Sequence, residues 1–357
     1  MVETPSFQTL LLLLRAALHR RCDMPEREVN WSEVYLLAQR HGVVALAWDG
    51  LKRMESEGRI CINTSIDRGL RLRWAMSVEQ IEKRSRSQHR VLLSLDAMLP
   101  NPGELFVFKG HALASRYPIP EHRECGDIDF FVPELYRETF EQNLLSHGAT
   151  ISGRNVKHVG YLLSHVALEC HLCFVWDYRK GKMSRMNEEL MALLPQSEPY
   201  AATQHIKQPS QAFNTLFIVA HNATHFRTEG MNLRQLLDWA LVLQELSWEE
   251  VKARLQPYGY LPYVTMMNRV AREWLHFPFA DEMCNADLSL YRRMEEDVAS
   301  FGRTDHAHSR KFWRKITCRL GECWQRRWAF HLVGDSLSRF LIRQLVAYLY
   351  HPKTFFS

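Results

Sequence analysis

The segment Gly-Asp-Ile-Asp-Phe-Phe-Val at 126–132 constrains the fold of this chain more than any other. Its apolar second half predicts a buried β-strand. Because side chains alternate between the two faces of a strand, Asp127 and Asp129 should share one face and lie about 7 Å apart. Two such carboxylates repel each other unless a cation lies between them. An Asp-x-Asp pair is often only a solvated turn, but the apolar neighbours favour a Mg²⁺ site, since Mg²⁺ binds carboxylates together with substrate phosphates.

A second candidate strand carries a third acid. Glu169 is flanked by apolar residues, where an acid is costly unless it is paired or binds a metal. If the two strands pair, Glu169 joins Asp127 and Asp129, and the three acids could form a two-metal site for displacement at phosphorus. Gly110 follows the apolar run at 105–108 and marks an expected strand-to-helix turn. A glycine at such a turn lets backbone N–H groups approach a phosphate.

Strand-like runs are concentrated in the middle of the chain, and helical periodicity dominates on both sides. Two of the runs, 158–163 and 165–176, are expected to pair with each other. A Pro- and Gly-rich break at 100–103 ends the first helical part. The pattern predicts an α+β fold with a small mixed β-sheet core flanked by N- and C-terminal helical segments. The predicted regions are helical at 1–100, α+β core at 101–180 and helical at 181–357.

Composition excludes several classes of protein. Lys and Arg number 45 against 40 Asp and Glu, so the net charge of +5 is too small for a purely electrostatic nucleic-acid binder. No apolar run approaches the roughly 20 residues of a membrane helix, and the N-terminal pattern is unlike a signal peptide. Eight scattered cysteines are typical of free thiols in a reducing compartment. Cys170 and Cys173 would face opposite sides of a strand, which disfavours a zinc site. We therefore expect a cytoplasmic protein without a transmembrane segment.

Two histidines form a further pattern. His221 and His225 are spaced to share one face of a helix expected over 210–225. The spacing is not a zinc-protease motif, because Asn stands where that motif has Glu. A structural role is about as well supported as a contact with nucleotide or acceptor, and Arg234 and Asp238 are candidates of the same kind.

A basic segment lies near the C-terminus. Residues 303–327 hold eight Lys or Arg against Asp305 and Glu322, together with apolar residues at helical spacing. This pattern predicts a helix over 309–329. Its basic face is either solvated or binds an anionic partner, such as RNA, an anionic acceptor or a membrane surface.

Together these motifs resemble the DNA polymerase β-type nucleotidyltransferase superfamily. In that superfamily a hydrophobic residue and Gly followed by Gly or Ser precede an Asp-x-Asp pair, and a third acid follows on a later strand. More narrowly, the Lys-Gly turn, Arg123 four residues before the first Asp, and the Glu-x-His strand resemble an uncharacterised bacterial nucleotidyltransferase family that is flanked by helices. The similarity spans roughly residues 5–245. The chain differs from the superfamily at His111, where Gly or Ser is usual, and in a longer loop before Asp127.

The resemblance implies roles for residues of this chain. Three acids would be catalytic and would bind Mg²⁺: Asp127, Asp129 and Glu169, the last as a ligand or as the base for the acceptor hydroxyl. Five residues would bind the nucleotide: Lys109, Gly110, His111, Arg123 and Gly126. Five others are candidate substrate contacts: His171, His221, His225, Arg234 and Asp238.

The implied reaction transfers a nucleoside monophosphate from an NTP, with ATP as the first candidate, to an acceptor and releases pyrophosphate. The acceptor could be a small molecule, a peptide or protein, or RNA. Two alternatives remain open. One is a catalytically inactive nucleotide- or partner-binding module of the same fold, and the other is an RNA-binding protein that acts through the basic segment.

Overall fold

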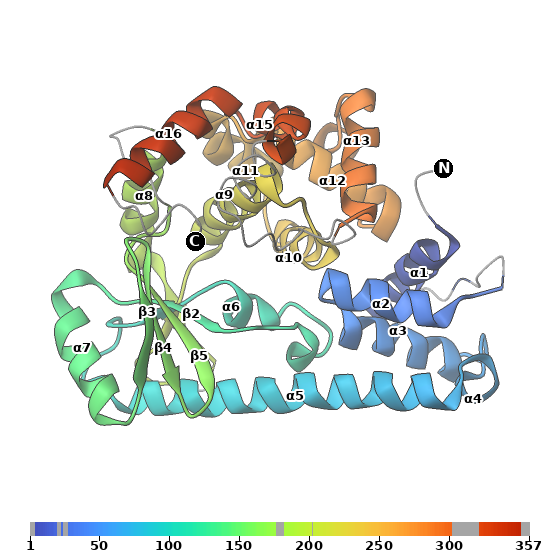
Figure 1. Ribbon diagram of the computed structural model, residues 1–357, viewed down its shortest axis with the longest axis horizontal. Coiled ribbons are helices and arrows are strands. Elements are labelled where there is room, and N and C mark those ends of the chain that lie inside the picture. Colours follow the sequence, from blue (N-terminus) through green and yellow to red (C-terminus); the bar gives the residue numbers. More distant parts are fainter. Residues whose placement is uncertain are drawn as a thin grey trace. The chain divides into compact units, whose positions relative to one another are not determined.

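The computed structural model in Figure 1 describes residues 4–19, 23, 28–175, 182–201, 203–301 and 321–350. The chain forms two compact units. We call residues 71–217 the sheet unit, and the described residues of 1–70 and 218–357 the helical unit. The boundaries between the units fall inside two helices, α5 (Arg68–Ala97) and α9 (Gln211–Thr228). The predicted region boundaries at residues 100 and 180 stay a prediction.

The sheet unit is built on a seven-stranded mixed sheet in the order β3-β4-β5-β2-β1-β7-β6. β2 pairs in parallel with β5, and β1 with β7, whereas the other neighbours are antiparallel. The strands are β1 (Phe106–Val107), β2 (Ile128–Phe131), β3 (Thr150–Arg154), β4 (His158–Leu163), β5 (Val166–His171), β6 (Glu198–Pro199) and β7 (Lys207–Gln208). The unit's own shorter helices are α6 (Gly110–Ala114), α7 (Glu134–Ser146) and α8 (Lys182–Leu193), with η1 (Pro120–His122) and η2 (Leu194–Gln196). The predicted α+β fold, a mixed sheet with helices before and after it in the chain, is confirmed.

The strand predictions differ from the structure in instructive ways. β4 has the predicted bounds, but β5 ends at His171, five residues before the predicted end at 176. Phe174 leaves the sheet and packs its ring against Phe131 and Phe213 instead. β3, β6 and β7 were not predicted, because β3 is exposed along its whole length and the other two have only two residues each.

Apolar side chains fix one face of the sheet. Ile128 and Phe130 of β2 join Leu168 and Cys170 of β5 in a single buried cluster. The helices α5 and α7 lie next to the sheet in Figure 1. They add five residues to this cluster: Val91, Leu92, Leu95, Phe140 and Leu144. Because strand side chains alternate, the residues between these apolar ones point to the opposite face. The core therefore determines which side chains can form a site on that opposite face.

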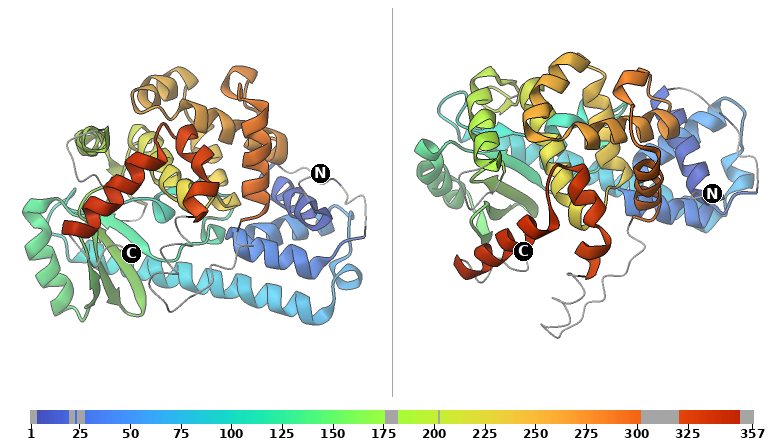
Figure 2. Two further views of the ribbon diagram at one scale, coloured as in Figure 1. Left: turned by 45° about the horizontal axis from the view of Figure 1, so that its top comes forward. Right: turned by 90° about the horizontal axis from the view of Figure 1, so that it is seen from above.

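The described part of the helical unit consists of helices and their connections, as the helical periodicity of the flanks predicts. The helices are α1 (Pro5–His19), α2 (Trp31–His41), α3 (Val44–Ser56), α4 (Ile62–Ser65), α10 (Leu233–Leu243), α11 (Trp248–Leu255), α12 (Leu261–Leu275), α13 (Leu288–Ala299), α15 (Arg327–Leu332) and α16 (Leu337–Tyr350), with η3 (Gln256–Tyr258) and η4 (Asp281–Met283). Asn30 caps the start of α2, and Gly42 ends it in the left-handed region at φ 65°. The Nδ1 atom of the buried His41 accepts the N–H of Leu233 at the start of α10. α12 packs against both α10 and α13 (Figure 2).

Most of the predicted basic helix lies outside the described residues, which resume at residue 321. Of its eight basic residues only Arg326 and Arg327 are described, and Arg326 forms an ion pair with Asp297. Among the helices that the structure describes, none has the length and apolarity that crossing a membrane requires.

Asp96, near the end of α5, holds a loop of the sheet unit. Its carboxylate accepts the backbone N–H groups of Gln204, His205 and Ile206 at 2.8, 2.7 and 2.9 Å. Partial burial alone would raise the pKa of Asp96, but these three donors outweigh burial and lower the pKa from its ordinary value. The ionised carboxylate therefore stabilises the loop that leads into β7.

We expect Asp96→Ala to lower the free energy of unfolding by about 2–3 kcal/mol, because partly buried donors lose their acceptor. Urea unfolding followed by tryptophan fluorescence measures the change. The exposed Glu138→Ala is the control and should change stability by less than about 0.5 kcal/mol.

The contacts of the Asp96 carboxylate with three backbone N–H groups also predict a pH effect for the variant Asp96→Asn. A lowered pKa means that the carboxylate stabilises the fold above the ordinary value of 3.8 and stops doing so as the pH falls through its folded value. The stability difference between wild type and variant should therefore be constant from neutral pH to about pH 5 and shrink below 3.8. A difference that grew with acidification would contradict this account.

Candidate active site

The acids meet because β2 and β5 pair in parallel and in register. Asp129 of β2 lies directly opposite Glu169 of β5, on the face away from the apolar cluster. Asp127 is half-buried, precedes β2 by one residue, and is close enough for the charges of Asp129 and Glu169 to influence its ionisation. The three acids predicted from the sequence are thus brought together in one region of the sheet unit.

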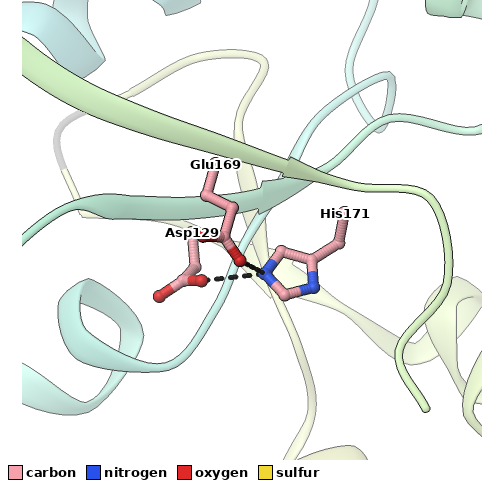
Figure 3. Close-up of side chains that lie close together, drawn as sticks. All are labelled: Asp129, Glu169 and His171. Atoms are coloured by element: carbon pink, nitrogen blue, oxygen red, sulfur yellow. Dashed lines mark hydrogen bonds and ion pairs between the residues drawn. The ribbon is translucent and has the colours of Figure 1, made fainter. Parts of the chain in front are cut away.

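His171 lies between two of these carboxylates. Its Nε2 atom is 2.8 Å from Asp129 Oδ1 and 3.0 Å from Glu169 Oε1, as Figure 3 shows. The potential ligand atoms of the three side chains all lie within 4.8 Å of one another. Among the described residues, no other group of three or more His, Cys, Asp or Glu side chains has its potential ligand atoms this close together. His171, predicted as a substrate contact, is therefore part of the acidic cluster itself.

Lys109 supplies the nearest full positive charge. Its Nζ atom lies 2.6 Å from Asp129 Oδ1 and 3.4 Å from His171 Nε2. The Lys109 backbone has φ 54°, a left-handed conformation that costs a non-glycine residue about 1–3 kcal/mol. The turn is held at both ends, by a hydrogen bond from Phe108 N–H to the Asp129 carbonyl and by the start of α6. This strained turn directs the ammonium group to the acids.

The ionisation of the cluster follows from burial and charge. Burial would raise the pKa of Asp129, but Lys109 and His171 outweigh it and hold that pKa well below its ordinary range. Burial likewise opposes ionisation of Glu169, yet the hydrogen bond with His171 lowers its pKa. The pKa of Asp127 is raised, first by burial and then by the charge of Asp129. Asp129 is therefore strongly held as an anion, Glu169 is also favoured as an anion, and Asp127 ionises less readily.

The chain matches a known protein family over most of its length. A family model described as an uncharacterised nucleotidyltransferase matches residues 27–276. The chain belongs to this nucleotidyltransferase family. The match includes the whole sheet unit, and residues 303–327 lie beyond it.

Two further comparisons were made with individual proteins. A crystal structure of ANT(2″)-Ia in complex with adenylyl-2″-tobramycin is similar over 49% of this chain and 97% of that chain, with 14% identity and a TM-score of 0.36. A search of curated proteins finds no match.

The backbone of Gly110 is closely approached by two side chains. A Cβ atom at Gly110 would lie 2.7 Å from Arg123 Nη1 and 2.8 Å from Cys125 Sγ. The glycine therefore lets the loop that carries Arg123 pack against α6. Its predicted role beside a phosphate stays a prediction.

The other nucleotide-binding candidates, Arg123, His111 and Gly126, differ in environment. Arg123 is buried and donates from Nη1 to the Glu124 carbonyl and to Cys125 Sγ, each at 3.2 Å. His111 is also buried, and burial together with the charge of Arg123 lowers the pKa of His111 to about 4. The imidazole is thus neutral at pH 7 and contributes no charge there. Gly126, in contrast, is exposed, and a Cβ atom added to it would meet open space to a distance of 4 Å.

α5 anchors the loop before β2 through polar contacts. His122 Nε2 lies 3.1 Å from Glu82 Oε1, and Gln88 Nε2 donates to the Cys125 carbonyl at 3.4 Å. At the acidic cluster, the Phe108 ring packs edge-on against His171, with 4.9 Å between the ring centroids.

The remaining candidates belong to the helical unit. His221 and His225 lie one turn apart on α9 with ring centroids 4.8 Å apart, and His225 Nδ1 is 2.9 Å from Glu229 Oε2. On α10, Arg234 lies against Gly42, and Asp238 is buried. The family match includes all four residues, and their role as substrate contacts stays a prediction.

One residue near the acids was not predicted. His158, the first residue of β4, lies opposite His171, and its Nδ1 atom is 3.2 Å from Glu169 Oε1. The sequence held part of the signal, since the runs 158–163 and 165–176 were expected to pair. The structure supplies the register: Ser164 and His165, both with positive φ, form the turn, and counting outward from it pairs 158 with 171.

The two glycines of the site offer a direct test. We expect Gly110→Ala to lower the free energy of unfolding by about 1–3 kcal/mol, because Arg123 and Cys125 must move away from the added methyl group. Gly126→Ala is the matched control and should be nearly neutral, since no atom lies within 4 Å of the added carbon. Thermal and urea unfolding of both variants measure the effect, and equal stabilities would contradict the packing role.

Proposed function

We propose that this chain transfers a nucleoside monophosphate from an NTP, with ATP as the first candidate, to an acceptor in a Mg²⁺-dependent reaction. The observation that carries the proposal is the in-register pairing of β2 and β5, which brings Asp129 beside Glu169 with Asp127 two residues before Asp129. Membership of a nucleotidyltransferase family supports the same reaction class.

The donor set fits a hard divalent cation. Asp127, Asp129 and Glu169 offer carboxylate oxygens, the ligands that Mg²⁺ prefers. The ammonium of Lys109 already interacts with Asp129, which is consistent with a region that attracts cations. Bound Mg²⁺ would stabilise the negative charge on the phosphoryl group during transfer.

The chain's own residues would then act on the substrates. Lys109 and Arg123 would neutralise the phosphates. The acceptor oxygen would form a bond to the α-phosphorus while the bond to the leaving pyrophosphate breaks, and the proton of a hydroxyl acceptor would pass to water. Glu169 is better suited to hold a cation than to take the acceptor's proton. Its pKa is lowered, whereas a general base works best with a pKa near the working pH.

Transfer of label from an α-³²P-labelled NTP tests the function. The protein is incubated with Mg²⁺, each of the four NTPs and fractionated cell extract, and the labelled product is identified as a small molecule, a protein or an RNA. We expect Asp127→Asn to reduce transfer by about 100-fold or more, because it removes a group that stabilises transition-state charge. Its thermal stability should stay close to that of wild type, and Glu138→Ala should remain fully active.

Two outcomes would oppose the proposal. Full activity in Asp127→Asn would show that the assignment of the metal ligands is wrong. Calorimetric binding of ATP with Mg²⁺ but no transfer in any fraction would favour the inactive binding module. The RNA-binding alternative predicts instead an RNA affinity that falls steeply with salt and is lost on deletion of residues 303–357.

A further inference from the structure

A chain of polar contacts outside the predicted site leads to Glu169. It begins at Asn155, in the turn between β3 and β4, and passes through the imidazole of His158 to Glu169 Oε1. His158 and His171 both contact this same oxygen, at 3.2 and 3.0 Å. Within the described residues, no hydrogen bond or ion pair falls on the other oxygen, Oε2.

The orientation of the Asn155 amide is set by its own backbone turn. Its Oδ1 atom accepts the N–H groups of Lys157 and His158 at 2.8 and 3.0 Å, which only an oxygen can do. The turn is closed further by bonds from Asn155 N–H to the His158 carbonyl and from Leu172 N–H to the Lys157 carbonyl. The amide nitrogen Nδ2 must therefore be the atom that faces His158 Nε2, at 2.9 Å.

This orientation decides which nitrogen of His158 carries the proton. Because Asn155 Nδ2 can only donate, His158 Nε2 must accept, and the proton of the neutral ring is on Nδ1. The Nδ1–H group then lies 3.2 Å from Glu169 Oε1. Both ring nitrogens are engaged, so His158 is suited to hold the carboxylate and not to carry a proton.

We infer that His158, kept in its Nδ1–H form by Asn155, is a positioning residue for Glu169. Together with His171 it fixes Oε1 and leaves Oε2 for the cation. The inference rests on the proposed function for the meaning of Glu169, but the proton position on His158 does not depend on any activity. Partners that orient a ligand in this way typically contribute 10- to 100-fold to metal affinity or rate.

The first test reads the proton position directly. Two-bond ¹⁵N–¹H correlation spectra of protein labelled with ¹⁵N-histidine distinguish the two neutral forms. The His158 signals among the 17 histidines are identified by their loss in His158→Asn. We expect the Nδ1–H form in wild type and its loss in Asn155→Ala. An Nε2–H form in wild type, or an unchanged ring in Asn155→Ala, would overturn the inference.

The second test uses turnover. His158→Leu removes the donor and should lower kcat about 10- to 100-fold, with KM for the NTP nearly unchanged. In His158→Asn the amide nitrogen can take the place of Nδ1, so this variant should recover most of the lost rate. Leu162→Ala lies on the same strand and face, is exposed, and should leave turnover unchanged. Thermal stability measured on each variant separates a loss of fold from a loss of positioning.

The outcomes distinguish the two proposals. Absence of nucleotidyl transfer in wild type would count against the proposed function, while the spectra would still decide the proton position. Normal transfer in wild type with full kcat in His158→Leu would overturn the positioning role alone, even if the Nδ1–H form is observed.

Discussion

The register between β2 and β5 is the constraint on which the site depends. A shift of one residue would send each side chain of a strand to the opposite face. That shift would bury Asp129 in the apolar cluster and expose Ile128 and Phe130, so the apolar face strongly favours the observed pairing. The same hydrophobic packing that stabilises the sheet therefore also brings Asp129 to Glu169.

Bringing carboxylates together in a partly buried place carries an electrostatic cost, and cationic partners offset it. Lys109 reaches Asp129 from a strained turn, and His171 Nε2 lies 2.8 Å from Asp129 and 3.0 Å from Glu169. Strained backbone in a non-glycine residue is typical of functional sites, where the surrounding structure holds it in place. The acids, the lysine and the histidine form one interdependent group.

α5 links this group to the rest of the sheet unit. Its apolar side chains pack under the sheet, and its polar side chains hold two loops. Glu82 and Gln88 anchor the loop that carries Arg123, and Asp96 anchors the loop before β7. A single long helix thus supports both the sheet and the loop that leads into Asp127.

The sequence by itself determined the features that depend on local pattern. Helical periodicity in the flanks and strand-like runs between them were enough to predict the α+β fold. The alternation around Asp127 and Asp129 and the apolar surroundings of Glu169 were enough to select these three acids as candidate site residues. The short, exposed strands were missed because they lack such a pattern. Only the tertiary structure decided the parallel pairing of β2 with β5, the contact of Lys109 with Asp129, and the place of His158 beside Glu169. The first two join residues far apart in the chain, which strand pairing and burial bring together and no local window of sequence contains, whereas the third depends on the register of the β4–β5 hairpin.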